Sequence, residues 1–367
     1  MDIKSVHTQL NKHKDAIRNT VESLNEFSSL VCFLRIISCN GDSPCNFSDA
    51  WCVAERSVDV DSTGRNPIVY FADLFDVTIL TQFLDTGTLP EHKKQSSTAL
   101  LKSFDRLAKF LDNYEETSKI LQKYSEKNLR EVEWAGIFGT HIAKQLAVVQ
   151  DMRMSDTGYE KVSVCICGCG NDLEYGDTSM GNKQVWHGSI DIFLGHVAID
   201  VAWQATDSSS TSAFELDTDN LDKYRHQLIA ETIVFSCTRS KGLVPTIAVS
   251  REKLKVFLYD HESDLLFESK EFPLASFTKE KELPYQTILA LWLAINYSLF
   301  GSGISPVYKQ AGYFANFKPF ITEKKKCEIY VKEMHLFGCK KVLTMLPPLS
   351  ATVDKKGQKG FWHVPRS

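Results

Sequence analysis

Residues 188–202 read GSIDIFLGHVAIDVA, and this stretch decides the fold. Apolar and polar residues alternate on both sides of Gly195 and His196, which is the pattern of two antiparallel strands joined by a two-residue turn. Each strand carries one aspartate, Asp191 in the first and Asp200 in the second. A carboxylate is costly inside an apolar strand unless something pairs with it. The two aspartates therefore need a physical explanation.

The predicted turn fixes how the two strands face each other. If Leu194 pairs with Val197, counting outward places Asp191 directly across from Asp200. Opposed residues have Cβ atoms about 4.5–5.5 Å apart, and like charges at that distance repel. A bound divalent cation would remove the repulsion, and carboxylate oxygens are ligands for Mg²⁺ or Mn²⁺. Such a metal can polarise a phosphodiester and activate water. The alternative is two half-exposed acids on the water-facing side of an antiparallel sheet.

The flanking sequence predicts an α+β protein with a central sheet. A helical pattern with Glu131 and Glu133 in its first turns precedes the hairpin. Periodicity and turn signals then predict the following further elements: a strand over Val162–Cys169, a polar loop over Gln204–Asn220, a helix over Leu221–Lys241, and strands over Val244–Ser250 and Lys255–Tyr259. The expected order is helix, three strands, helix and two strands.

This arrangement resembles the restriction-endonuclease-like, PD-(D/E)XK, nuclease superfamily over roughly residues 126–260. The resemblance implies that the hairpin carboxylates bind a divalent metal, often with a glutamate from the preceding helix. By position, Asp191 matches the first acid, Asp200 the second, and Glu131 or Glu133 the helical one. The implied function is that of a nuclease dependent on Mg²⁺ or Mn²⁺, or of a degenerate relative, that acts on or binds DNA.

One position departs from the family pattern. The family places a lysine two residues after the second acid, where this chain has Ala202. Losing that amine removes a general acid-base contribution of about 10²–10⁴ in rate. Lys223, Gln227 and Glu231 are spaced i, i+4 and i+8 in the following predicted helix and would share a face, so Lys223 is a candidate for a displaced lysine. The competing hypothesis is a non-enzymatic interaction or scaffold protein built on an inactive nuclease fold.

Other motifs have simpler explanations. Acids near a helix start, such as Glu131 and Glu133, also favour the helix macrodipole. His187 would lie on the aspartate face, but a lone histidine usually makes a structural hydrogen bond. The cysteines of VCICGCG alternate onto one face of the predicted strand, yet zinc needs a fourth ligand and no second Cys or His pair with finger spacing lies nearby. We therefore interpret these three, Cys165, Cys167 and Cys169, as ordinary thiols.

Charge is distributed unevenly along the 367 residues. Lys plus Arg is 42 and Asp plus Glu is 46, so the net charge of -4 gives no general attraction to nucleic acid. From Glu323 onward, however, ten basic and four acidic residues give +6, which leaves -10 on the rest. DNA contact is therefore expected in this basic tail, unless the tail is simply solvated. Its lysines include Lys324, Lys325, Lys326, Lys340, Lys341, Lys355, Lys356 and Lys359.

Composition divides the chain into three parts: a helical N-terminal region (1–125), the nuclease-like core (126–275) and a C-terminal helical extension with the basic tail (276–367). Helices are expected within 1–35, 73–86 and 97–124, and a strand over Cys327–Val331. Residues 283–307 lack charge, but their continuous apolar part is too short to span a bilayer, so we expect a buried helix and no membrane partner. The charged N-terminus and scattered cysteines favour an intracellular protein, nuclear or cytoplasmic, with reduced thiols and not secreted. The oligomeric state is not predicted.

Overall fold

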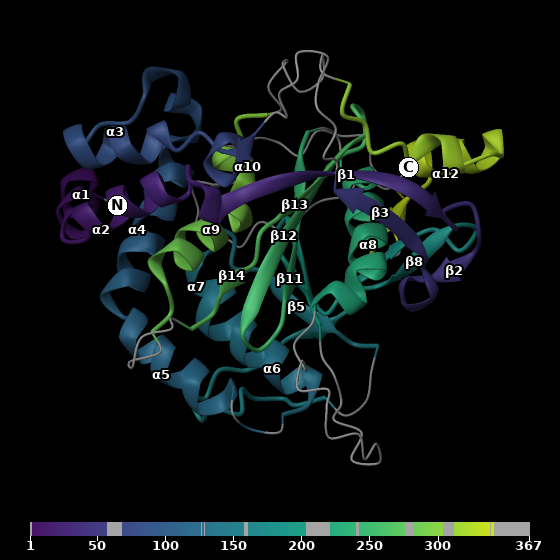
Figure 1. The fold of residues 1–367 in the computed structure, drawn as a ribbon. Coiled ribbons are helices and arrows are strands. Elements are labelled where there is room, and N and C mark those ends of the chain that lie inside the picture. Colours follow the sequence, from purple (N-terminus) through teal and green to yellow (C-terminus); the bar gives the residue numbers. More distant parts are fainter. Residues whose placement is uncertain are drawn as a thin grey trace.

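The computed structural model shows a mixed α and β molecule with helices on both faces of a long central sheet (Figure 1). It describes residues 2–56, 68–125, 127, 129–157, 161–202, 221–239, 242–275, 282–303, 312–337 and 339–340. The loop expected over Gln204–Asn220 and the basic residues from Lys341 to Arg366 lie outside the described residues.

The central sheet takes its strands from distant parts of the chain. Its order along the main path is β3 (Cys52–Arg56), β1 (Leu30–Cys39), β13 (Leu265–Ser269), β12 (Lys253–Asp260), β11 (Val244–Val249), β10 (Val197–Val201), β9 (Ile192–Leu194), β5 (Met152–Ser155) and β6 (Tyr175–Gly176). Two further strands join the path at its sides, β4 (Val69–Tyr70) on β1 and β14 (Phe272–Pro273) on β12. Strands β10 and β11 are parallel, whereas β9 and β10 are antiparallel. The central strands are buried because helices cover both faces, and most of their residues are apolar.

One face of the sheet packs on a large helical layer, which lies on the left and at the bottom of Figure 1. Its first helices are α1 (Ile3–Asn11), α2 (Lys14–Ser23), α3 (Thr78–Thr86), α4 (Ser97–Asp112) and α5 (Tyr114–Ser125). They are followed by α6 (Glu131–Phe138), a π-helical turn (Gly139–Ala143), α7 (Lys144–Leu146), α9 (Tyr285–Ile295) and α10 (Tyr297–Phe300). Helix α9 is buried nearly all round, as its uncharged sequence predicts. No helix within the described ranges is long and apolar enough to cross a bilayer.

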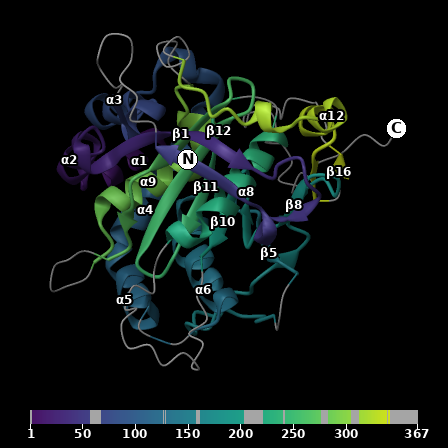
Figure 2. The same cartoon turned by 45° about the vertical axis from the view of Figure 1, so that its right-hand side comes forward.

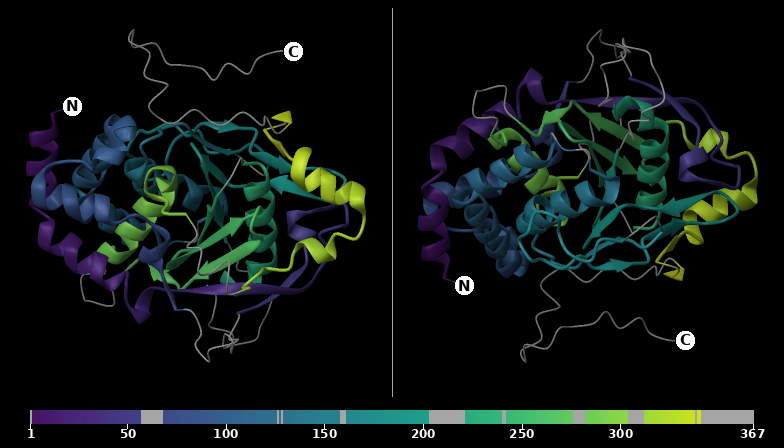
Figure 3. Two further views of the ribbon diagram at one scale, coloured as in Figure 1. Left: turned by 90° about the horizontal axis from the view of Figure 1, so that it is seen from above. Right: turned by 90° about the horizontal axis from the view of Figure 1, so that it is seen from below.

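The other face packs on α8 (Arg225–Cys237), which Figure 2 shows between the central strands and a smaller sheet. That sheet has the order β16 (Cys339–Lys340), β15 (His335–Leu336), β7 (Ser179–Gly181), β8 (Trp186–Ser189) and β2 (Cys45–Asn46). Helix α12 (Lys324–Lys332) lies beside it, at the opposite end of the molecule from α1 in both views of Figure 3.

The predicted hairpin is present, with two corrections. Leu194 pairs with Val197 and Gly195 has a positive φ of 58°, so the register is confirmed. The first strand breaks before Asp191, however, and its two halves, β8 and β9, belong to different sheets. The side expected to be polar is not solvated either, because α8 covers it and Asp200 is only 4 % exposed. The explanation as half-exposed acids is therefore wrong for Asp200.

Three other expectations are wrong. Residues 162–169 form turns rather than a strand. The strand that pairs with the hairpin on this side is β5. Residues 30–35 were expected to be helical but lie in strand β1, where their β-branched and aromatic side chains fit between β3 and β13. Residues 327–331 lie in helix α12, whose Ile329 and Tyr330 are buried.

The helical segment that precedes the hairpin is interrupted, with the π-turn between α6 and α7. The three-part division of the chain stays a prediction. In the structure, β1 of the first part pairs with β13 of the second.

Candidate functional site

Four carboxyl groups beside the hairpin lie close enough to shift one another's pKa, and we call them the carboxylate cluster. They belong to Glu131 at the start of α6, Asp191 between β8 and β9, Asp200 on β10 and Glu231 on α8. The carboxyl group of Asp191 interacts electrostatically with that of Glu131 and with that of Asp200. The charge of Glu231 acts on Asp200 from the helix side. The sequence pattern named all four residues as site candidates.

The backbone explains how Asp191 meets Asp200. Ile192 pairs with Ile199, so continuing the register by one residue sets the two aspartates opposite each other. The strand break turns the carboxyl of Asp191 toward β10, where its Oδ2 accepts a hydrogen bond from the backbone N–H of Val201 at 2.7 Å. One backbone donor thus orients Asp191, while Asp200 lies fully inside the layer covered by α8.

Glu231 approaches the aspartates from α8 and is 0 % exposed. Gln227, one turn earlier, donates from Nε2 to Glu231 Oε1 at 2.8 Å, so the predicted i, i+4 pair is present. The other oxygen, Oε2, is buried without a hydrogen-bond partner among the described residues. Leaving a buried acceptor unsatisfied costs about 1–3 kcal/mol, and more when the group is charged. The unsatisfied oxygen Oε2 of Glu231 is therefore a candidate ligand atom.

All four carboxyls of the cluster have a raised pKa, because burial and neighbouring negative charges disfavour their ionised forms. Burial, and then the charge of Asp200, raises the pKa of Asp191 well above its usual value. Burial and Glu231 do the same to the pKa of Asp200. Burial and Asp191 raise the pKa of Glu131 to about 8, although this residue lies at the exposed edge, and burial raises the pKa of Glu231 to about 8. The leading charges that act on these groups are all negative, so each carboxylate makes ionisation of its neighbours more costly.

Other residues predicted for the site lie elsewhere. Glu133 caps α6, because its carboxylate accepts hydrogen bonds from the backbone N–H of Arg130 at 2.8 Å and from its guanidinium at 2.9 Å. Lys223 is exposed in a short 3₁₀ turn before α8, so it does not share a helix face with Gln227. His187 lies on β8 in the smaller sheet, where its Nδ1 contacts the carbonyl oxygen of Val185 at 2.9 Å.

Sequence reasoning missed a lysine on the same face of the sheet. The register Asp200–Ala248–Lys255 crosses three adjacent strands, so the Cα atoms of Asp200 and Lys255 are about 10 Å apart. The ammonium of Lys255 binds Asp222 at 2.7 Å and Glu268 at 3.3 Å, and it belongs to a neighbouring ion network. Its sequence signal is weak, because Lys255 is one of three charged residues in the strand KLKVFLYD.

Comparison with known proteins adds no relative. No family model matches the chain, and no curated protein or solved structure matches it. The resemblance to the PD-(D/E)XK nucleases stays a prediction, and the functional argument below depends on the geometry of the carboxylate cluster.

Proposed function

We propose that the carboxylate cluster binds Mg²⁺ or Mn²⁺ and that the protein uses the metal to hydrolyse phosphodiester bonds in DNA. One observation carries the proposal: the buried Glu231 Oε2 has no hydrogen-bond partner among the described residues, in a group whose other members are carboxyls. Hard oxygen ligands of this kind are the ones that Mg²⁺ and Mn²⁺ prefer. A divalent cation would satisfy the lone pairs and offset the repulsion in one step.

The proposed roles follow from where the four acids lie. Asp191 and Asp200 would hold the metal, and Glu231 with Gln227 would close the site from the helix side. Glu131 is exposed, so its side of the cluster is the side that a phosphate can approach. Bound metal would polarise the phosphate and activate water. The pKa of about 8 lies close to neutral pH, so Glu131 can exchange a proton at the site, which matters because Ala202 supplies no amine.

One observation favours the second candidate, a metal-stabilised scaffold without activity. Ala202 is only 7 % exposed and packs in the core beneath α8, while Lys255 is already paired with Asp222 and Glu268. In that case the cluster would still bind a cation, but no ammonium would help to position water. The two candidates share the metal site and differ in catalysis.

The test is cleavage of linear and single-stranded DNA with Mg²⁺ or Mn²⁺. The variant Asp191→Asn, Asp200→Asn is compared with Asp15→Asn, an exposed acid on α2. Metal-dependent cleavage that falls at least about 10²-fold in the double variant and persists in the control supports the nuclease. A metal-induced rise in melting temperature without cleavage, lost in the double variant, supports the scaffold. If neither cleavage nor stabilisation occurs, the metal site itself is refuted.

DNA contact is proposed for the basic tail. Lys324, Lys325 and Lys326 lie in the first turn of α12, where Lys326 also pairs with Glu323 at 3.1 Å. Lys341, Lys355, Lys356 and Lys359 lie outside the described residues. Replacing the three helical lysines with glutamine should weaken DNA binding and reduce its salt dependence, because fewer phosphate counterions are released.

A further inference from the structure

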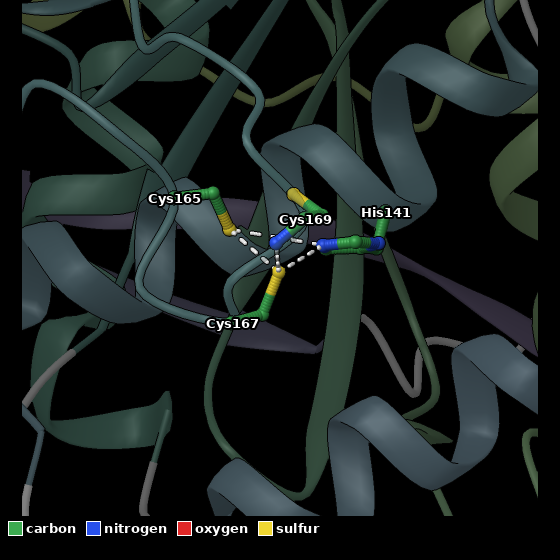
Figure 4. A group of neighbouring side chains, drawn as sticks. All are labelled: His141, Cys165, Cys167 and Cys169. Carbon is green, nitrogen blue, oxygen red and sulfur yellow. Dashed lines mark hydrogen bonds between the residues drawn. The ribbon is translucent and has the colours of Figure 1, made fainter.

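A second cluster of metal-ligating side chains lies away from the carboxylates. His141 Nε2 and the Sγ atoms of Cys165, Cys167 and Cys169 lie within 4.8 Å of one another, and Figure 4 shows the four side chains pointing toward a common centre. The Nε2 atom is 3.0 Å from the sulfur of Cys167 and 3.7 Å from that of Cys165. The sulfurs of Cys165 and Cys167 are 3.3 Å apart.

These separations are close to those of a tetrahedral zinc site. With Zn–S near 2.3 Å and Zn–N near 2.0–2.1 Å, tetrahedral angles require about 3.8 Å between sulfurs and about 3.6 Å between sulfur and nitrogen. The distances from Cys165 to His141 and to Cys167, 3.7 and 3.3 Å, differ from these values by half an ångström or less, and the 3.0 Å between His141 and Cys167 is shorter by about 0.6 Å. Small outward shifts of the side chains would therefore admit one ion.

The turn that replaced the expected strand is what brings the sulfurs together. In an extended strand, residues i and i+4 are about 13 Å apart, so Cys165 and Cys169 could not share an ion. In the structure, the N–H of Cys165 donates to the carbonyl of Asn171 at 2.9 Å, which closes the loop. Gly168 and Gly170 have φ values of 85° and 74°, a conformation that other residues rarely adopt. The glycines of VCICGCG thus allow three ligands within five residues.

The fourth ligand comes from the interrupted helix. His141 lies in the π-turn between α6 and α7, and such turns occur often at functional sites. Two N–H groups also point at the sulfurs: the backbone of Cys169 donates to Cys167 Sγ at 3.3 Å, and Asn171 Nδ2 donates to Cys169 Sγ at 3.1 Å. Donors of this kind stabilise thiolates, the form of cysteine that binds metal.

We propose that His141, Cys165, Cys167 and Cys169 bind one Zn²⁺ in a closed, structural site. Three thiolates and one imidazole form a common structural zinc set, and four protein ligands leave no position for substrate. The ion ties the loop over residues 161–174 to the helical segment that begins at Glu131. Leu173 of this loop already packs on α6, where a Cβ at Gly136 would lie 2.8 Å from Leu173 Cδ1.

The zinc site is independent of the proposed function. Ten residues separate Glu131 from His141, or about 15 Å along the helix axis. The carboxylate cluster offers hard oxygen ligands, whereas this cluster offers sulfur and nitrogen, so different ions suit the two sites. Failure of the nuclease assay would leave the zinc proposal unaffected, and the reverse also holds.

The test is metal analysis of the full chain purified in reducing buffer without chelator. We expect one zinc per chain by elemental mass spectrometry, and a tetrahedral thiolate–cobalt absorption spectrum after exchange with Co²⁺. Cys167→Ser and His141→Ala should each lose most of the zinc, while Cys32→Ser, a half-buried thiol on β1, should keep it. Chelator should lower the melting temperature of the wild type and of Cys32→Ser by several degrees.

Further outcomes decide the proposal even if a ligand variant fails to fold. In the wild type, zinc should protect three thiols from alkylation, and chelator should expose them. Peptide mapping should identify these three as Cys165, Cys167 and Cys169. The proposal is overturned if the metal-free chain binds neither Zn²⁺ nor Co²⁺, if Cys32→Ser loses the metal equally, or if Cys165 and Cys167 form a disulfide under the same reducing conditions.

Discussion

Two buried acids of the central sheet, Glu268 and Asp200, have different charged neighbours. Glu268 on β13 is 1 % exposed and receives Arg225 at 3.0 Å, Arg56 at 3.2 Å and Lys255 at 3.3 Å. Asp200, 4 % exposed on the same sheet, has other carboxyls as its leading charged neighbours. The chain thus supplies its own cations to one group of acids. At the other group, the charges that act most strongly on Asp191 and Asp200 are those of carboxyls.

This difference matters because burying an uncompensated charge costs several kcal/mol. Three cations pair with Glu268, so this protein compensates a buried acid where it can. The carboxylate cluster therefore needs an explanation of its own. Either the acids hold protons or they hold a metal. Experiments can distinguish the two states, and variants at the cations that pair with Glu268 serve as a comparison within the same protein.

The largest effect is expected for Lys255→Met. Its side chain is 3 % exposed, and removing the ammonium leaves Glu268 and Asp222 without their shared partner. Because Glu268 keeps Arg56 and Arg225, this change should lower the free energy of unfolding by about 1.5–3 kcal/mol, measured by urea denaturation. The matched control is Lys253→Met, two residues earlier on β12, whose side chain is 24 % exposed. That change should cost about 1 kcal/mol or less. Equal losses would show that burial does not set the value of these pairs.

The next effect is a pH dependence that belongs to the carboxylate cluster. Burial raises the pKa of Glu231 from its ordinary 4.5 to about 8, so the folded protein binds more protons than the unfolded chain between these values. The free energy of unfolding should therefore fall as pH rises through this window, by about 1–3 kcal/mol from pH 6 to pH 8 without divalent metal. Thermal unfolding across this pH range measures it.

Glu231→Gln should reduce this dependence, because an amide cannot ionise and its oxygen can still accept from Gln227, while the other three acids of the cluster still titrate. Glu328→Gln, the same change at an exposed position on α12, should leave it unaltered. Mg²⁺ added at pH 8 should stabilise the wild type more than Glu231→Gln. If wild-type stability instead rises from pH 6 to pH 8 in metal-free buffer, the cluster is not a group of repelling acids.

Part of the carboxylate cluster could be predicted because short-range rules determine it. A two-residue turn sets the register, and the register alone brings Asp191 to Asp200. The i, i+4 spacing likewise predicted that Gln227 and Glu231 share a face. What the sequence could not show is burial: alternation in VAIDVA is typical of a half-exposed strand, but the small residues Ala198 and Ala202 instead admit α8.

Parts of the fold were missed where long-range packing overrides local pattern. The alternating run from Trp186 to Leu194 is a single strand by periodicity, yet its two ends pack in cores on opposite sides of the central sheet, so it breaks before Asp191. The group formed by His141, Cys165, Cys167 and Cys169 was missed for a similar reason. Its fourth ligand, His141, lies 24 residues before Cys165, in a π-turn that no periodicity rule predicts.

The smallest effect is expected for Arg56→Met, and it tests how the compensation of Glu268 is divided. The side chain of Arg56 is 50 % exposed, whereas that of Arg225 is 20 % exposed and also donates to the carbonyl of Ala54 at 2.6 Å. Because water already screens Arg56 and Glu268 keeps two cations, the loss should be about 1 kcal/mol or less. Arg225→Met should cost more than Arg56→Met and less than Lys255→Met. A reversed order in urea denaturation would mean that Glu268 depends on its most exposed partner, and the contrast with the carboxylate cluster would then no longer follow from burial.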